Sequence, residues 1–126
     1  MGMITTFFNV GNTKNLAPLE AMQLNDPRFS SYSDVPPLDL KDHATTFALQ
    51  QLRFVSISDY AYEIKNLRVD LFDNFAIATF VVKQTGMIVD NYSFRGQHLS
   101  MESRATFVLL KSPKWKIVHI HLSKIS

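Results

Sequence analysis

The sequence predicts an α+β domain in which helices from the first half of the chain pack on an antiparallel sheet formed by the second half. Three observations predict this fold class. Apolar residues recur at helical spacing up to Val55, and from Tyr60 onward they alternate with polar residues. In addition, 46% of the 126 residues are hydrophobic and 19% are charged, which suits one folded domain over residues 1–126.

Two short helices are expected before residue 25. Ile4, Phe7 and Phe8 share one face of a single amphipathic turn that Gly11 ends. Asn15 is the predicted N-cap of a second helix, because apolar residues follow it at helical spacing. These residues are Leu16, Leu19 and Met22.

The longest helix is predicted after Pro36-Pro37, which favours an extended connection. Asp39 is the expected N-cap, with Asp42 in the first turn. The apolar residues that follow near a period of 3.6 are expected to face a sheet. They are Ala44, Phe47, Ala48, Leu52 and Val55.

The second half reads as strands joined by turns at Asp73-Asn74 and at Ser112-Pro113-Lys114. Residues 60–64 and 67–71 alternate, and residues 75–83 are almost continuously apolar. Two further strands are expected over 97–111 and 115–123. An antiparallel meander that bends around the helices satisfies this pattern.

Composition excludes several classes of function. The chain has 13 Lys and Arg against 11 Asp and Glu, a formal charge of +2, without the basic cluster of a nucleic-acid binder. It has no Cys, so thiol catalysis, disulfides and zinc–thiolate sites are excluded. No signal or membrane-spanning segment is visible, so we expect a cytoplasmic protein that binds neither membrane nor nucleic acid.

The last strand carries two apolar faces. Strict alternation places Trp115, Ile117, His119, His121 and Ser123 on one face, and Lys116, Val118, Ile120 and Leu122 on the other. One face is expected to meet the helices. The other is expected to meet a second copy of the same sheet, which predicts a homodimer through the outer sheet face.

The preceding strand divides in the same way. Ala105, Phe107 and Leu109 form a face suited to sheet-on-sheet packing, and the opposite face carries Glu102 and Arg104. One interpretation makes Arg104 an anchor for a ligand anion, with Glu102 as an orienting group or a base. The alternatives are a buried ion pair and two solvated side chains near a strand end.

His119 and His121 point the same way and have the spacing of a two-histidine chelate. A metal site needs a third ligand on that face, and neither Ser123 nor Trp115 is a good donor for zinc. Hydrogen-bonded histidines at a subunit interface are therefore the preferred interpretation. No metal and no cofactor are predicted.

The run from Arg104 to Ser123 resembles the terminal signature of SnoaL-like domains in the nuclear transport factor 2-like superfamily. Its pattern is an Arg-led strand, a short turn, and Trp-x-Ile-Val-His-x-His-x-Ser. The association domain of calcium/calmodulin-dependent kinase II is also similar. Upstream, residues 26–32, the helix after Asp39 and residues 73–82 resemble the same group.

This resemblance implies a cystatin-like fold: a cone-shaped curved antiparallel sheet wrapped around N-terminal helices, with a cavity at the wide end and subunits paired through the outer face. It also implies that Arg104 points into the cavity and that His119 and His121 lie outside. Two departures limit the comparison. Val81 and Leu122 stand where the association domain has further cavity arginines, and no Asp base with a Tyr and Asp oxyanion hole, as in steroid isomerases, can be assigned.

Three functions are therefore compatible with the sequence. The first is binding of a small ligand with an anionic or carbonyl group near Arg104, in a pocket of Tyr62, Val81, Val118, Ile120 and Leu122. The second is catalysis of the ketosteroid-isomerase or polyketide-cyclase type, by proton transfer or hydrolysis with Glu102 as base. The third is an oligomerisation module without a ligand. The expected dimer interface consists of Phe107, Trp115, His119 and His121.

Overall fold

The computed structural model describes residues 2–90, 95–111 and 113–125. Helices dominate the first half of the chain and long strands the second, as predicted. The elements are α1 (Gly2–Thr13), α2 (Ala17–Met22), β1 (Ser30–Tyr32), α3 (His43–Ser56), β2 (Ser58–Leu71), β3 (Phe75–Asp90), β4 (Arg95–Lys111) and β5 (Trp115–Lys124).

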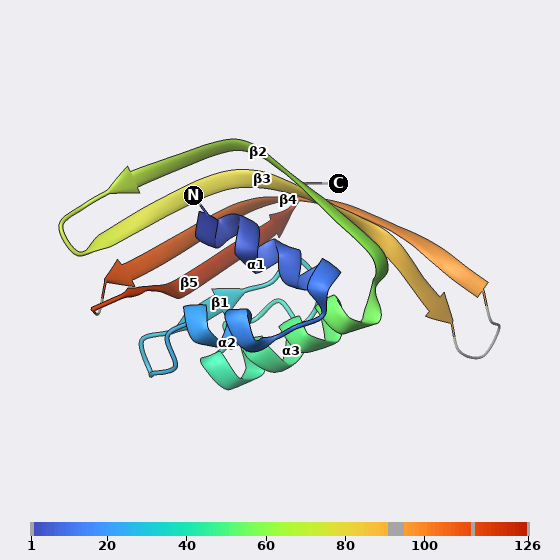
Figure 1. Cartoon of the computed structure of the whole chain (residues 1–126), viewed down its shortest axis with the longest axis horizontal. Coiled ribbons are helices and arrows are strands. Elements are labelled where there is room, and N and C mark those ends of the chain that lie inside the picture. The colour runs from blue at the N-terminus through green and yellow to red at the C-terminus, as the bar shows by residue number, and fades with distance from the viewer. Residues whose placement is uncertain (1, 91–94, 112, 126) are drawn as a thin grey trace.

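The five strands form one sheet in the order β1-β5-β4-β3-β2 (Figure 1). The predicted antiparallel meander is confirmed for β2 to β5. The short strand β1 instead pairs in parallel with β5, with Ser31 opposite Ile120, so the sheet is mixed. At the other end of the sheet, β3 and β4 continue beyond Met87 as a two-stranded arm.

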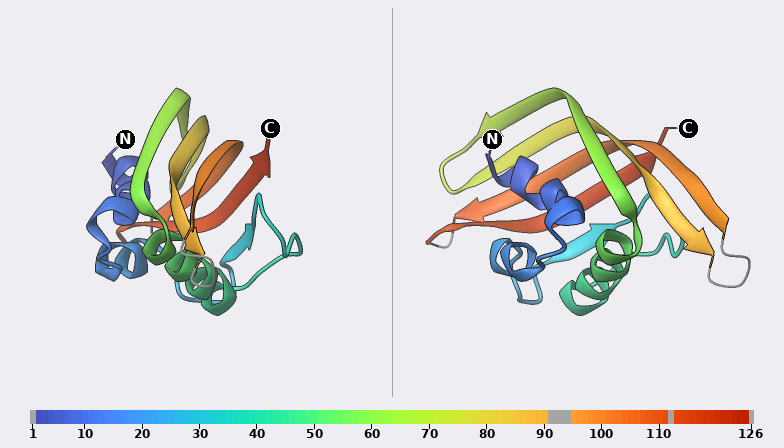
Figure 2. Two further views of the ribbon diagram at one scale, coloured as in Figure 1. Left: turned by 90° about the vertical axis from the view of Figure 1, so that its right-hand side faces the viewer. Right: turned by 45° about the vertical axis from the view of Figure 1, so that its right-hand side comes forward.

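The sheet is curved, and all three helices lie on its concave side (Figure 2). Shifts in pairing register occur in β2 and in the β4–β5 pair. Such bulges add a residue to one strand and bend it. The curvature leaves room between the helices and the sheet, which is where the site described below lies.

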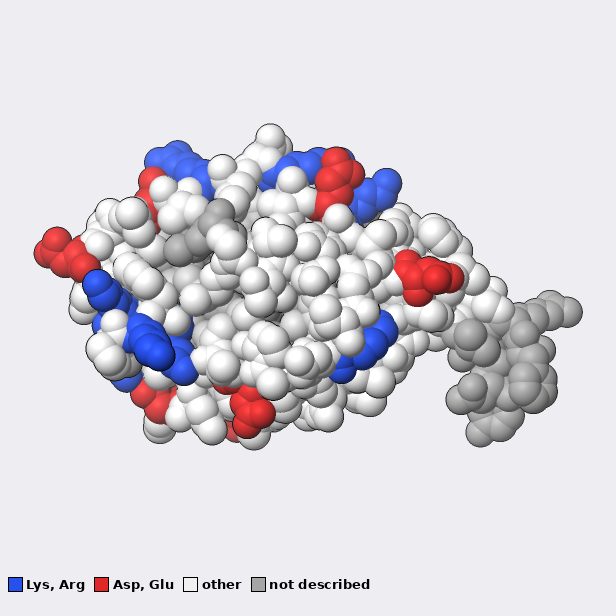
Figure 3. All heavy atoms as spheres, in the orientation of Figure 1, with Lys and Arg blue, Asp and Glu red and all other residues white. Residues whose placement is uncertain are grey.

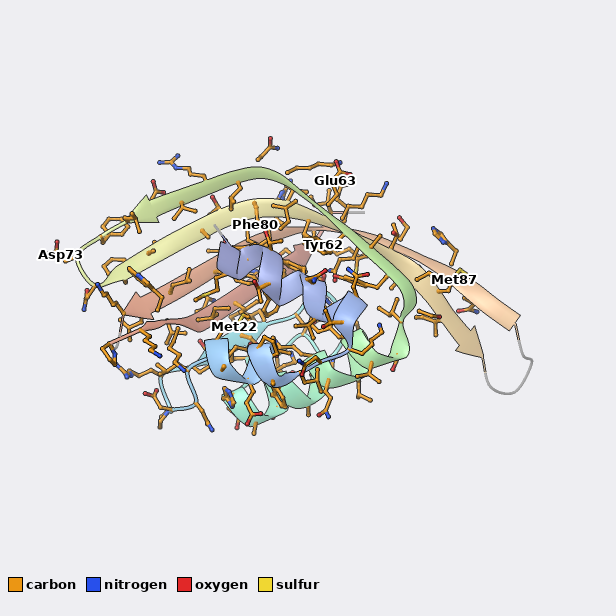
Figure 4. The ribbon with its side chains drawn as sticks, in the orientation of Figure 1. Met22, Tyr62, Glu63, Asp73, Phe80 and Met87 are labelled. Atoms are coloured by element: carbon orange, nitrogen blue, oxygen red, sulfur yellow. The ribbon has the colours of Figure 1, made fainter. Side chains whose placement is uncertain are left out.

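The core forms where α1 crosses the sheet. Phe7 contacts the ring of Phe107 with centroids 5.0 Å apart, and Phe8 contacts Phe80 at 5.9 Å. All four rings are almost fully buried. Figure 4 shows Phe80 and Tyr62, which both contact Phe8, on the part of the sheet nearest α1. Burial of such large apolar side chains, worth about 1.5–3 kcal/mol each, holds α1 against the sheet.

A bulge in β5 changes which residues share a face. Val108 pairs with His119, whereas Leu109 pairs with Ile117, so Val118 is the extra residue. Ile117 therefore joins Ile120 and Leu122 on the buried side. The prediction of strict alternation through this strand is wrong at that point, since a bulge reverses the sidedness of the residues before it.

The helices also differ in detail from the predictions. Asp42, not Asp39, caps α3, because its Oδ1 accepts a hydrogen bond from the Thr45 amide at 2.9 Å. α1 extends through Gly11 to Thr13 instead of ending after one turn. Gly11 is tolerated inside this helix because it allows close approach of the Tyr60 ring.

The inward face of α3 is rotated from the predicted one. Thr46 and Phe54 are buried, whereas Leu52 is 65% and Val55 is 53% exposed. Helical spacing alone does not distinguish these faces, because apolar residues occur on both. Among the described residues, no helix is both long and apolar enough to cross a membrane.

Candidate ligand cavity

A cavity of about 360 Å³ lies between α3, the middle of α1 and the concave side of the sheet. This volume is within the range of small-molecule sites. The loop from Ser33 to Lys41 forms one wall, and Ile88 from the β3–β4 arm and Leu99 beside its base form another. Three separate parts of the fold therefore meet around it.

Most of the cavity wall is apolar. The apolar lining comes from α1, from α3 and the residue after it, from β4 and from β5. The main contributors are Phe7, Phe8, Leu49, Phe54, Ile57, Leu99, Met101, Ile120 and Leu122. A wall of this kind favours an apolar ligand through removal of its surface from water.

One charged pair crosses between the elements at the cavity wall. Arg53, on α3, lines the cavity and donates from Nη2 to Asp34 Oδ1 at 2.6 Å. Ser103, on β4, donates from Oγ to Asp34 Oδ2 at 2.7 Å. The carboxylate is 0% exposed and the Arg53 side chain 17%. Loop, helix and sheet are thus joined through one buried carboxylate.

The charge state of Asp34 follows from these contacts. Burial alone raises the pKa of this carboxyl group, but the Arg53 charge and the hydrogen bonds from Arg53 and Ser103 outweigh that effect. The pKa of Asp34 is therefore held below its usual value. Asp34 is an ionised partner of Arg53 near neutral pH.

Several other polar groups on the wall make hydrogen bonds within the chain. Ser31 Oγ and Thr46 Oγ1 lie 2.6 Å apart in a hydrogen bond. Gln50 exchanges two hydrogen bonds of 2.8 Å with Gln23. The buried ammonium of Lys41 donates to the carbonyl oxygens of residues 37 and 39 in its own loop.

The structure places only part of the predicted pocket at this cavity. Ile120 and Leu122 line it. Val81 lies on the opposite side of the sheet, Val118 is the bulge residue, and Tyr62 packs against Phe8 without reaching the cavity wall. That Ile120 and Leu122 bind a ligand remains a prediction.

Arg104 and Glu102 do not face the cavity. Arg104 is exposed, and Glu102 is partly exposed opposite Lys83 on β3. Their neighbours Met101, Ser103 and Ala105 are the buried residues of β4. The prediction that Arg104 anchors a ligand there, with Glu102 as base, is wrong in its placement, because the more apolar set of β4 packs under the helices.

Two of the four predicted interface residues also face the helices. Phe107 is 0% exposed and contacts Phe7, and Trp115 packs against the same core. Their assignment to the outer face is therefore wrong. His119 is half-buried and His121 exposed on the other side, bonded to Ser30 Oγ and Ser123 Oγ respectively, each at 2.8 Å.

Among the described residues, His119 and His121 are not joined by a third metal-ligating side chain. Within residues 2–90, 95–111 and 113–125, no three His, Cys, Asp or Glu side chains are grouped closely enough to hold a metal ion. The hydrogen bonds to Ser30 and Ser123 account for one ring nitrogen of each histidine.

Arg53 and Asp34 were not among the residues singled out from the sequence. A signal for Arg53 does exist, since Leu49 and Ile57 stand one turn to either side of it and also line the cavity. An arginine flanked in this way lies on an apolar helix face. Asp34 has no such signal, because it precedes an irregular loop and its partners are 19 and 69 residues away.

No family model matches the chain by sequence, and no curated protein matches it. Solved structures do match. A proposed dehydratase of the nuclear transport factor 2-like family from Streptomyces avermitilis superposes with a TM-score of 0.81 at 14% identity, covering 98% of this chain and 92% of that one. The chain therefore adopts the nuclear transport factor 2-like fold.

Two further structures show the same fold in other settings. A proposed ketosteroid isomerase from Shewanella frigidimarina has a TM-score of 0.68 at 17% identity, covering 97% of this chain and 92% of that one. The calcium/calmodulin-dependent kinase II hub from S. rosetta has a TM-score of 0.71 at 17% identity, covering 98% and 92%. At such identities the likeness shows the fold alone.

Proposed function

We propose that this protein binds a small, mainly apolar molecule in the cavity between α3 and the concave side of the sheet. The observation that carries the proposal is the cavity itself, about 360 Å³ with a mostly apolar wall. Contact between water and the apolar wall of this cavity is unfavourable. An apolar ligand that displaces the water removes this cost. The polar recognition group is Arg53, not Arg104.

Binding is better supported than catalysis by a carboxylate base. No Asp or Glu side chain of the described part of the chain lines this cavity. Asp34 is the nearest candidate, but each of its oxygens already accepts a short hydrogen bond, and its depressed pKa makes it a weak base. The proposed dehydratase and ketosteroid isomerase among the similar structures support a small-molecule site in this fold.

A cavity-filling variant tests the proposal. Ligand can be sought by native mass spectrometry of the purified protein and by thermal shift with a panel of small apolar compounds. Leu49→Trp fills the cavity from α3 and is expected to abolish both co-purification and stabilisation. Val55→Trp adds the same side chain to an exposed position of the same helix and should leave both unchanged. Binding that persists in Leu49→Trp would contradict the proposal.

A second function, assembly through the outer sheet face, is favoured by a separate observation. The side of β3 and β4 that faces away from the helices carries partly buried apolar residues, namely Ile77, Val81, Val108 and Leu110. On the helix-covered face, Figure 3 shows charged side chains around the rim. We propose a homodimer through this outer face, with His119 and His121 at its edge. Light scattering at micromolar concentration tests it.

A further inference from the structure

Two cationic side chains line the cavity, and their charged groups are held differently. The Lys41 ammonium is 3% exposed and is turned into its own loop, where two carbonyl oxygens accept its protons. Arg53 has five N–H donors. One of them is used on Asp34, and no other described residue accepts from the guanidinium.

The Arg53 side chain is held by its own helix and, through Asp34, by the sheet. Its carboxylate partner is itself held by Ser103 at 2.7 Å, so the guanidinium is attached to the sheet as well as to α3. Leu49 and Ile57, one helical turn before and after it, form the apolar wall beside it. Because Arg53 itself lines the cavity, a ligand that fills the apolar space would lie beside this oriented side chain.

The charge of Arg53 is already neutralised. Asp34 is ionised and fully buried 2.6 Å from Nη2. A ligand carboxylate at the same guanidinium would bring a second anion close to Asp34 in a region of low dielectric, which is unfavourable. A neutral carbonyl oxygen accepts the unused N–H groups without adding charge, and it brings no donor that needs a partner.

We infer that the cavity selects a neutral, mainly apolar molecule with a ketone or aldehyde oxygen bound by Arg53, and that it discriminates against the matching carboxylate. This inference rests on the proposed function and specifies the class of ligand. The selectivity comes from Asp34, which touches Arg53 but not the ligand.

Three probes of similar shape test the inference by equilibrium dialysis: 2-acetylnaphthalene, 2-naphthoate and 2-ethylnaphthalene. The wild-type protein should bind the ketone about tenfold more tightly than the hydrocarbon, because one hydrogen bond to a charged donor is gained. It should bind the carboxylate more weakly than the ketone. Equal binding of ketone and hydrocarbon, or tightest binding of the carboxylate, overturns the inference.

Asp34→Asn supplies a sharper test. The amide keeps the shape and can still accept from Arg53 and pair with Ser103, but it removes the negative charge. The preference should reverse, with 2-naphthoate binding more tightly than 2-acetylnaphthalene. Asp70→Asn, in the exposed pair with Arg68 on β2, is the matched control and should keep the wild-type order. An unchanged order in Asp34→Asn overturns the role of Asp34.

The hydrocarbon separates failure of the inference from failure of the proposed function. If 2-ethylnaphthalene binds and Leu49→Trp removes that binding, the cavity is a ligand site whatever the order of the other two probes. If none of the three compounds binds, the proposed function and the inference both fail. Should Asp34→Asn not fold, the wild-type order of affinities still decides the inference.

Discussion

Ser30 Oγ and His119 Nδ1 lie 2.8 Å apart and join the short edge strand β1 to β5. The two residues are also directly paired in the parallel register of these strands. Because β1 has only three residues, this side-chain hydrogen bond is a substantial part of what attaches it. His121 and Tyr32 lie beside the pair on the same face.

Acid is expected to weaken this edge of the sheet. Burial, and to a lesser extent the charge of His121, lowers the pKa of His119 below its ordinary 6.5. The folded protein therefore binds this proton less tightly than the unfolded chain, so stability present above pH 6.5 is lost as pH falls below it. The melting temperature should fall between pH 7.5 and 5.5.

The contribution of His119 is isolated by comparing variants. His119→Gln does not titrate and should show a smaller fall over the same interval. His98→Gln, at an exposed position of β4, is the control and should follow the wild type. An identical pH dependence in wild type and His119→Gln would assign the effect to other groups.

Asp34 should be far more important for stability than an exposed carboxylate. Asp34→Ala leaves Arg53 without its partner and Ser103 without its acceptor in a buried position. Loss of one member of a buried ion pair costs about 3–5 kcal/mol. Urea denaturation measures it. Asp70→Ala, which breaks an exposed pair, should cost less than about 1 kcal/mol. Equal losses of unfolding free energy in the two variants would show that the buried ion pair stabilises the protein no more than the exposed one.

Gly11 should resist even the smallest substitution. A Cβ atom at this position would lie 2.7 Å from Cγ of Tyr60 and closer still to two other ring carbons. The ring cannot move without disturbing the 2.8 Å hydrogen bond from its hydroxyl to Gln84. Gly11→Ala should therefore destabilise the protein by about 1–3 kcal/mol, although alanine favours a helix.

Gly2→Ala is the matched control in the same helix, because no atom lies within 4 Å of the added methyl group. Its expected effect is within about 0.5 kcal/mol of zero. Both can be measured by thermal unfolding. A stabilised Gly11→Ala would mean that helix propensity outweighs the contact with Tyr60.

The sequence predicts the arrangement of elements well and the cavity poorly, for a definable reason. Alternation correctly groups Ala105, Phe107 and Leu109, but it does not say whether that set faces helices or another subunit. The buried set is decided by contact with Phe7 and Phe8, far away in the chain. Assigning Arg104 to the cavity requires the opposite choice.

Local irregularities account for the remaining differences. The bulge at Val118 moves Trp115 and Ile117 to the side opposite His119. No residue type in this segment predicts a bulge. On α3, apolar residues occur on both faces, so helical spacing does not identify the inward one. For this reason the sequence does not predict that Arg53 lines the cavity. Ion pairs between a loop and a distant helix, such as Asp34 with Arg53, depend on tertiary structure and not on any local pattern.

Phe107 distinguishes a core residue from an interface residue. It is fully buried within one chain and contacts Phe7 and Phe80. Phe107→Ala should therefore destabilise the fold by about 3–5 kcal/mol at any protein concentration. Chemical denaturation at two concentrations checks this. Val108→Ala, at the next position on the outer face, should cost less. A loss seen only at low protein concentration would instead place Phe107 at an interface.

The proposed homodimer through the outer face of the sheet can be tested at Val108. Val108 lies between Ile77 on β3 and His119 on β5, and it is only partly buried by its own chain. If a second copy covers this face, Val108→Asp places an unpaired charge in the interface and should convert the dimer to a monomer. Leu52→Asp, on the exposed face of α3, should not. Light scattering coupled to size exclusion measures both, and circular dichroism confirms that each variant is folded. A wild-type protein that is monomeric at tens of micromolar, or a Val108→Asp variant that stays dimeric, would remove this face as the contact between copies.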